Sequence, residues 1–267
     1  MFVYVALLGL VTGSFLSALT YRLPRGIKIS SGRSLCVNCK KTIAWYDNIP
    51  LLSYLILKGK CRKCKKKISP RYFVIELATA LLFTAIYLAT LKCAGAAYLT
   101  NAWNGAICNI NNNLGIWTLP YLLILSSALL AIFITDFEYQ IIPDQLVIFL
   151  LFLVFLTHFF STADNFYALI FSGFSAALFF LFLNIVTGGR GMGLGDAKLG
   201  LVGGLFFGLG NSFYWLTVSF ILGAVVGLIL IFSGKAKFGK PIPFGPFLIA
   251  GYIITMLFST KFPIINL

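Results

Sequence analysis

The chain has 267 residues, of which 60% are hydrophobic and only 10% are charged. A soluble domain carries about 25% charged residues, so this composition excludes an ordinary soluble protein and indicates a membrane protein. The formal net charge of +14 would point to nucleic acid in a soluble protein, but in a membrane protein the placement of the charges matters more.

Stretches of about 20 apolar residues can cross a bilayer. The first run has no basic segment before it and no clear cleavage site after it, so we interpret it as a retained span rather than a signal peptide. We therefore expect an all-α, polytopic membrane protein with about eight transmembrane helices. The predicted spans are residues 2–19, 72–91, 116–135, 146–160, 166–186, 197–210, 213–232 and 246–258.

The basic residues fall almost entirely in alternate loops. The loop at 20–71 holds 14 Lys and Arg residues, the loops at 188–198 and 233–245 hold five more, and the other side receives only Lys92 and Lys261. Lys and Arg concentrate in cytoplasmic loops. This split of 19 to 2 predicts eight spans with both termini outside, and it argues for keeping the short span at 197–210.

The longest predicted cytoplasmic loop contains two CxxC pairs, Cys36 with Cys39 and Cys61 with Cys64. This spacing suits a tetrahedral thiolate zinc site in which each pair forms a knuckle. Four free thiols or two disulfides are the alternatives, although a reducing cytoplasm disfavours disulfides. A structural zinc ion would supply folding energy to a lysine-rich loop that can bury little core.

Six lysines and an arginine crowd the second knuckle, between Lys58 and Lys67. Nucleic-acid binding is one interpretation of a basic zinc knuckle. Because the loop is tethered between two spans, we favour contact with anionic lipid headgroups and expect no nucleic-acid partner. In the outer loop at 92–115, Cys93 and Cys108 are either a disulfide pair or two unrelated buried thiols.

Two short polar stretches interrupt the apolar sequence, and each carries an aspartate at the end of a span. Asp196 follows Gly193 and Gly195 and starts a stripe of glycines at steps of four, which predicts a close helix–helix contact. Asp136 ends the span at 116–135. The alternatives are that Asp196 only caps its helix and that Asp136 is simply the first solvated residue past the membrane.

Ionisable groups at membrane depth are costly and are therefore candidates for function. Two carboxyl groups held close together cannot both ionise easily, so one keeps its proton. The ionised group can then take a proton from water while the protonated one polarises a carbonyl. No nucleophile has a suitable histidine, because His158, the chain's only histidine, lies near the outer end of its span and suits packing.

The motifs and their order closely resemble those of the type IV prepilin peptidases, which are bifunctional leader peptidase/N-methyltransferases of the bacterial inner membrane. The resemblance covers nearly the whole chain, although GxGD alone also occurs in other intramembrane aspartyl proteases. The matching segments are GSFL at 13–16, the two CxxC pairs, WYDNIPLLSY at 45–54, ISPRYFVIE at 68–76, TDFE at 135–138, IIPD at 141–144, GLGDAK at 193–198 and PFGPF at 243–247.

The resemblance implies that the protein removes the basic leader of prepilins or pseudopilins after a glycine, at the cytoplasmic membrane face. It implies that the new N-terminus is then methylated with S-adenosylmethionine. The family's catalytic aspartates map onto Asp136 and Asp196, with Asp144 as second choice and Gly193, Gly195 and Lys198 in support. The cysteine module is associated with the methyltransferase half, and candidates for the methyl-donor site are Asn48, Arg71 and Glu76.

These expectations divide the chain into a first transmembrane helix at 1–20, a zinc-binding module at 21–71, a second transmembrane helix with its outer loop at 72–115, and an aspartyl peptidase domain at 116–267. A membrane transporter is the main rival, because carboxylates and glycine-broken helices also mark ion pathways. A membrane-anchored metal-binding module is the third interpretation. The sequence predicts no oligomeric state.

Overall fold

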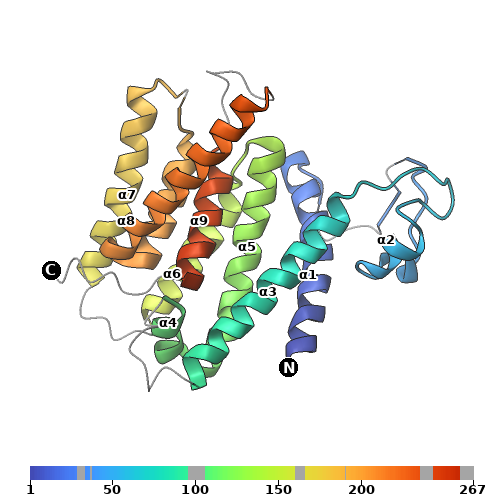
Figure 1. Ribbon diagram of the computed structural model, residues 1–267, viewed down its shortest axis with the longest axis horizontal. Coiled ribbons are helices and arrows are strands. Elements are labelled where there is room, and N and C mark those ends of the chain that lie inside the picture. The colour runs from blue at the N-terminus through green and yellow to red at the C-terminus, as the bar shows by residue number, and fades with distance from the viewer. Residues whose placement is uncertain are drawn as a thin grey trace. The chain divides into compact units, whose positions relative to one another are not determined.

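A computed structural model describes residues 1–28, 34–36, 38–95, 106–159, 166–189, 191–234 and 243–258. Within these ranges the regular structure is helical, apart from two isolated β-bridges. The predicted all-α class is therefore confirmed (Figure 1). The α-helices are α1 (Phe2–Arg22), α2 (Leu52–Ile56), α3 (Arg71–Gly95), α4 (Ala106–Leu114), α5 (Thr118–Tyr139), α6 (Asp144–Phe159), α7 (Phe166–Val186), α8 (Leu194–Phe232) and α9 (Gly245–Phe258).

Five helical segments in the described ranges are long and apolar enough to cross a membrane: Phe2–Arg25, Arg71–Cys93, Ile110–Tyr139, Tyr167–Val186 and Leu194–Phe232. Two shorter apolar helices, Asp144–His158 and Gly245–Phe258, join them. The chain is thus a multi-pass membrane protein. That the chain crosses the membrane eight times stays a prediction, as does the placement of both termini outside.

The chain divides into two compact units, Met1–Tyr87 and Leu88–Leu267. In the first unit, α1 and α3 approach so closely that a Cβ atom added at Gly9 or Gly13 would lie 2.7 Å from the Cα of Ala80 or Glu76, respectively. Small residues allow this kind of backbone contact in membranes, where apolar side chains gain little by leaving lipid. The cysteine module lies in the sequence between these two helices, as predicted.

In the second unit, α7 and α8 pack through a glycine contact. A Cβ atom at Gly204 would lie 2.6 Å from the carbonyl oxygen of Ser172 and 2.7 Å from the Cα of Gly173. The glycine stripe that begins at Asp196 therefore faces α7, with Gly200 against Phe180. The predicted close helix contact is present, and its partner is α7.

Helix α8 corresponds to two predicted spans, at 197–210 and 213–232, and it breaks at Gly208, whose φ of 69° and ψ of 176° are not helical. Trp215 packs its ring against Gly203, although residues twelve apart in a straight helix lie about 18 Å apart. The two arms therefore fold back on each other at Gly208 (Figure 1). Glycine is suited to this position because φ is positive.

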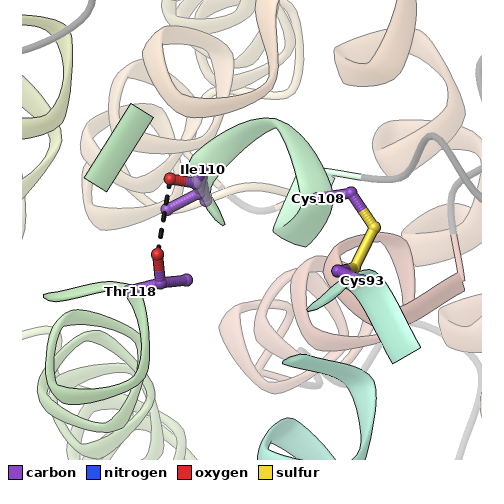
Figure 2. The surroundings of a disulfide bond; sticks show 4 residues. All are labelled: Cys93, Cys108, Ile110 and Thr118. Carbon is purple, nitrogen blue, oxygen red and sulfur yellow. Dashed lines mark hydrogen bonds between the residues drawn. A yellow bond between two sulfur atoms is a disulfide. The ribbon is translucent and has the colours of Figure 1, made fainter. Parts of the chain in front are cut away.

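The predicted outer loop contains a helix that its polar, asparagine-rich sequence did not suggest. Helix α4 carries Cys108, which forms a disulfide with Cys93 near the end of α3 (Figure 2). The hydroxyl of Thr118, at the start of α5, donates to the carbonyl of Ile110 at 3.5 Å. Of the two alternatives left open for these cysteines, the structure has the disulfide.

Candidate active site and metal centre

Asp136 lies in the last turn of α5, which continues to Tyr139 instead of ending at 135 as the predicted span does. Its side chain is buried, with 6% of the residue exposed. The carboxylate accepts a hydrogen bond from the backbone N–H of Gly245, the first residue of α9. Asp136 is therefore not a solvated residue beyond the helix.

Asp196 lies in the first turn of α8 and is equally buried. Its Oδ2 accepts a hydrogen bond of 2.9 Å from the backbone N–H of Gly193, the residue that precedes the helix. Asp196 thus satisfies one of the N–H groups that a helix start leaves without an intrahelical partner. The capping role that the sequence left open is present, and it leaves the second carboxylate oxygen available for other contacts.

The two aspartates lie close enough to interact electrostatically. The side chain of Ile142, in the turn between α5 and α6, links their surroundings. A Cβ atom added at Gly195 would lie 2.8 Å from Ile142 Cδ1, and one added at Gly245 would lie 3.4 Å from the same atom and would collide with the carboxylate of Asp136. The ends of α5, α8 and α9 therefore meet around this buried pair.

Asp144 and Lys198 lie outside the buried pair. The ammonium of Lys198, in the second turn of α8, is 2.5 Å from the carboxylate of Asp144, the first residue of α6. Both side chains are about half exposed or more, so this ion pair adds little stability. It instead ties the start of α6 to the start of α8.

Two residues that the sequence did not single out hold the loop before Asp196. The side-chain amide of Asn184, near the end of α7, donates to the carbonyl of Met192. The hydroxyl of Thr187 accepts a hydrogen bond from the backbone N–H of Gly191 at 3.1 Å. The sequence also did not single out Gly245, whose segment PFGPF was noted only because it resembles the family's motif.

The four cysteines of the module converge, with their sulfur atoms within 4.8 Å of one another. Each pair forms the same turn: the N–H of Lys40 donates to the carbonyl of Cys36 at 2.8 Å, and that of Lys65 donates to Cys61 at 2.9 Å. Lys40 and Lys65 both have positive φ values, of 53° and 57°. The two pairs are therefore equivalent knuckles.

The geometry fits a tetrahedral metal site. The sulfurs of Cys36 and Cys64 are 3.9 Å apart, and four sulfurs held about 2.3 Å from a zinc ion are about 3.8 Å apart. Hydrogen bonds, above all from the backbone N–H of Lys66, lower the pKa of the Cys64 thiol to about 6, whereas loss of solvation and the neighbouring thiols raise the pKa of Cys39. Backbone N–H groups of Cys39 and Asn38 also lower the pKa of Cys36. Thiolates are the form that binds metal.

Two of the three methyl-donor candidates are engaged within the first unit. Glu76 is buried and accepts hydrogen bonds from the backbone N–H of Leu51, at 2.8 Å, and from the hydroxyl of Ser14. Arg71 donates to the carbonyl of Ser17 at 3.0 Å and to the hydroxyl of Thr20 at 2.7 Å. These contacts hold the module to α1 and α3, and the role of both residues in binding a methyl donor stays a prediction. Asn48 is exposed.

The two units correspond to two known sequence families. Residues 7–90 match the bacterial peptidase A24 N-terminal domain, and residues 123–228 match the type IV leader peptidase family. The chain belongs to the type IV leader peptidase family. The family assignment gives no support to the transporter interpretation. No solved structure matched this chain.

The chain is similar over most of its length to curated proteins that bear the name prepilin leader peptidase/N-methyltransferase. One from Pseudomonas aeruginosa is 34% identical, across 92% of this chain and 87% of its own length. One from Vibrio cholerae is 32% identical, across 96% of each chain. One from Bacillus subtilis is 30% identical, across 94% of this chain and 92% of its own length.

Proposed function

We propose that this chain is an inner-membrane aspartyl endopeptidase that removes the leader of prepilins or pseudopilins and then methylates the new N-terminus. The observation that carries the peptidase half is the buried pair of Asp136 and Asp196, contributed by the ends of two membrane helices and close enough to interact electrostatically. The methyltransferase half rests on the names of the relatives and on the match of the first unit to their N-terminal domain.

In the proposed reaction the two carboxyl groups share one proton. The ionised carboxylate takes a proton from a water molecule as the water oxygen attacks the scissile carbonyl carbon. The protonated carboxyl donates a hydrogen bond to the carbonyl oxygen and stabilises the charge that develops there. When the tetrahedral intermediate collapses, the C–N bond breaks and the leaving amine takes up a proton from the pair.

The surroundings of the pair serve this chemistry by fixing both carboxylates. The N–H of Gly245 holds Asp136 and the N–H of Gly193 holds Asp196, so neither side chain has to be ordered when substrate binds. A prepilin has its apolar helix in the bilayer and its basic leader in the cytoplasm. Its cleavage site would then meet the helix ends that carry the aspartates, at the cytoplasmic face of the membrane.

In the proposal Cys36, Cys39, Cys61 and Cys64 hold a structural zinc ion. Four thiolates leave no open position on the metal, so it supplies folding energy to the module and no catalysis. The methyl donor is S-adenosylmethionine, as the relatives' name implies. Asn48, Arg71 and Glu76 stay the candidates for the donor site, although Arg71 and Glu76 also bind groups of the first unit.

Two substrates separate the two activities: an intact prepilin, and a pilin that already lacks its leader. We expect Asp136→Asn and Asp196→Asn to lose leader removal but to methylate the processed pilin. Cys36→Ser should show the reverse pattern, removing leaders but failing to methylate the processed pilin. It should also lose the zinc ion, roughly one per chain, that is expected for four thiolates. Mass spectrometry reads both products. Leader removal at wild-type rate by either aspartate variant would refute the peptidase assignment.

A further inference from the structure

The module exposes an apolar surface that its own fold does not cover. Six large side chains between Trp45 and Ile56 are exposed, with Trp45 at 81% and Ile56 at 71% of their surface. We define these six as the apolar patch. They are Trp45, Tyr46, Ile49, Leu52, Leu55 and Ile56.

The patch is held by specific contacts and is not a loose loop. The hydroxyl of Ser53, in α2, is buried and donates to the carbonyl of Tyr46 at 2.9 Å. Arg62 pairs with Asp47 through two nitrogens, at 2.7 Å and 3.0 Å, and lies 5.4 Å above the ring of Tyr46. Arg62 of the second knuckle therefore fixes the segment around Tyr46. The hydrogen bond from Ser53 fixes the same segment against α2.

Two contacts place the patch beside the first two turns of α3. The N–H of Leu51 donates to Glu76 in the second turn of α3, and the ring of Tyr54 lies 5.4 Å from that of Phe73 in the first turn. Glu76 is about 7 Å along the helix from its first residue. Since Val74 and Leu77 in the same two turns are exposed on a membrane-spanning helix, α2 lies at the depth where lipid begins.

The charges around the patch select the kind of surface that covers it. Lys58 and Lys60 directly follow α2, and Lys63, Lys65 and Lys67 are exposed on the second knuckle. Exposed lysines that follow exposed Trp, Tyr and Leu side chains closely in the sequence are the pattern of an element that lies in the interface of an anionic leaflet. Aromatic rings such as those of Trp45 and Tyr46 favour the headgroup region.

We propose that the apolar patch inserts into the headgroup and upper acyl region of the leaflet at the start of α3, with the surrounding lysines on anionic lipid phosphates. The module is then a monotopic membrane element and not a domain suspended in the cytoplasm. Lipid composition would control how the module is held, because each lysine near an anionic surface is attracted to it.

The test uses the full-length protein in nanodiscs, with lipids brominated on the upper acyl chain as quenchers of tryptophan fluorescence. The contribution of Trp45 is the difference between the wild type and Trp45→Phe. We expect bromine to remove about half or more of the Trp45 emission, as for a side chain buried 5–10 Å into the interface. Quenching should be stronger with phosphatidylglycerol present than in pure phosphatidylcholine.

Matched variants identify the patch as the cause. Leu55→Glu should reduce the quenching of Trp45 at least about twofold, because a charge at the interface opposes insertion. Thr42→Glu, at an exposed position of the same module outside the patch, should leave it unchanged. Equal unfolding midpoints would show that both variants fold.

Three results would contradict the proposal, the first two as a whole and the third in the role that it gives to the lysines. Trp45 emission that is insensitive to brominated lipid in both lipid mixtures would place the patch outside the bilayer. Insensitivity to bromine combined with a spectral shift on adding a prepilin would assign the patch to a protein partner. Equal quenching with and without anionic lipid would show that the lysines do not hold the module on anionic phosphates.

Discussion

At the scale of single residues, both candidate catalytic side chains depend on a glycine. Asp136 accepts a hydrogen bond from the N–H of Gly245, and Asp196 accepts one from the N–H of Gly193. Hydrogen bonds to an ionised carboxylate are about twice as strong as neutral ones, which helps to offset the cost of burying it. The absence of a Cβ atom at Gly245 also leaves the space that the carboxylate of Asp136 occupies.

We predict that Gly245→Ala slows leader cleavage about 100-fold, because the new methyl group displaces the carboxylate of Asp136 from its position. The matched control is Gly227→Ala in α8, where an added Cβ atom meets nothing within 4 Å. The measurement is the rate of leader removal by each purified variant. A Gly245→Ala enzyme as fast as the control would show that the position of Asp136 tolerates this change.

The sequence identified the two aspartates and four cysteines because rare residue types stand out in an apolar chain. Gly245 carries no such signal. It matters because it contacts the carboxylate of Asp136, which lies in another helix and comes near only in the folded chain. For Arg71 and Glu76 the structure adds a role that the sequence did not show, because their polar atoms help to hold the first unit together. Their role as donor ligands stays a prediction.

At the scale of elements, hydropathy predicted the positions of the membrane helices well, and glycine positions explain how they pack. The hydropathy pattern could not show that the segments at 197–210 and 213–232 form one element folded at Gly208, because hydropathy carries no information on backbone φ angles. Helix α4 was missed because Asn111, Asn112 and Asn113 have weak helix propensity. Its link to Cys93 through Cys108 constrains a segment that propensity alone would leave non-helical.

We predict that Gly204→Ala destabilises the protein by about 1–3 kcal/mol, because the added methyl group meets the backbone of α7, which cannot turn away as a side chain can. Gly227→Ala is again the control and should be neutral or slightly stabilising, since alanine favours a helix over glycine. Unfolding midpoints in detergent measure both. Equal midpoints for the two variants would contradict the close contact of α7 with α8.

At the scale of the whole chain, the two sets of cysteines differ in their oxidation, as the predicted orientation in the membrane requires. Cys93 lies near the end of α3 and is oxidised, whereas the four module cysteines before α3 are not disulfide-bonded. The 23 residues from Arg71 to Cys93 span about 33 Å of helix, close to the thickness of the hydrocarbon core. Disulfides persist in oxidising compartments, so this agrees with the orientation that the lysine distribution predicts.

We predict that a membrane-impermeant maleimide added to intact cells labels Cys93 and Cys108 only after an impermeant reductant has opened their disulfide. Cys39 should react only once the membrane is permeabilised and metal is removed. One variant that keeps only Cys93 and Cys108, and another that keeps only the four module cysteines, assign the labelling to each set. Labelling of Cys39 from outside intact cells would reverse the proposed orientation.

The central claim is that Asp136 and Asp196 act as one catalytic unit, and single-turnover rates of leader cleavage test it most directly. Each single substitution to asparagine should slow cleavage by about 1,000-fold or more, and the double variant should be no slower than either single one, because groups that act together lose their effect together. Glu138→Gln, two residues along α5 and about 200° around the helix from Asp136, should retain most activity. Losses that multiply in the double variant, or a single variant with the wild-type rate, would contradict the claim.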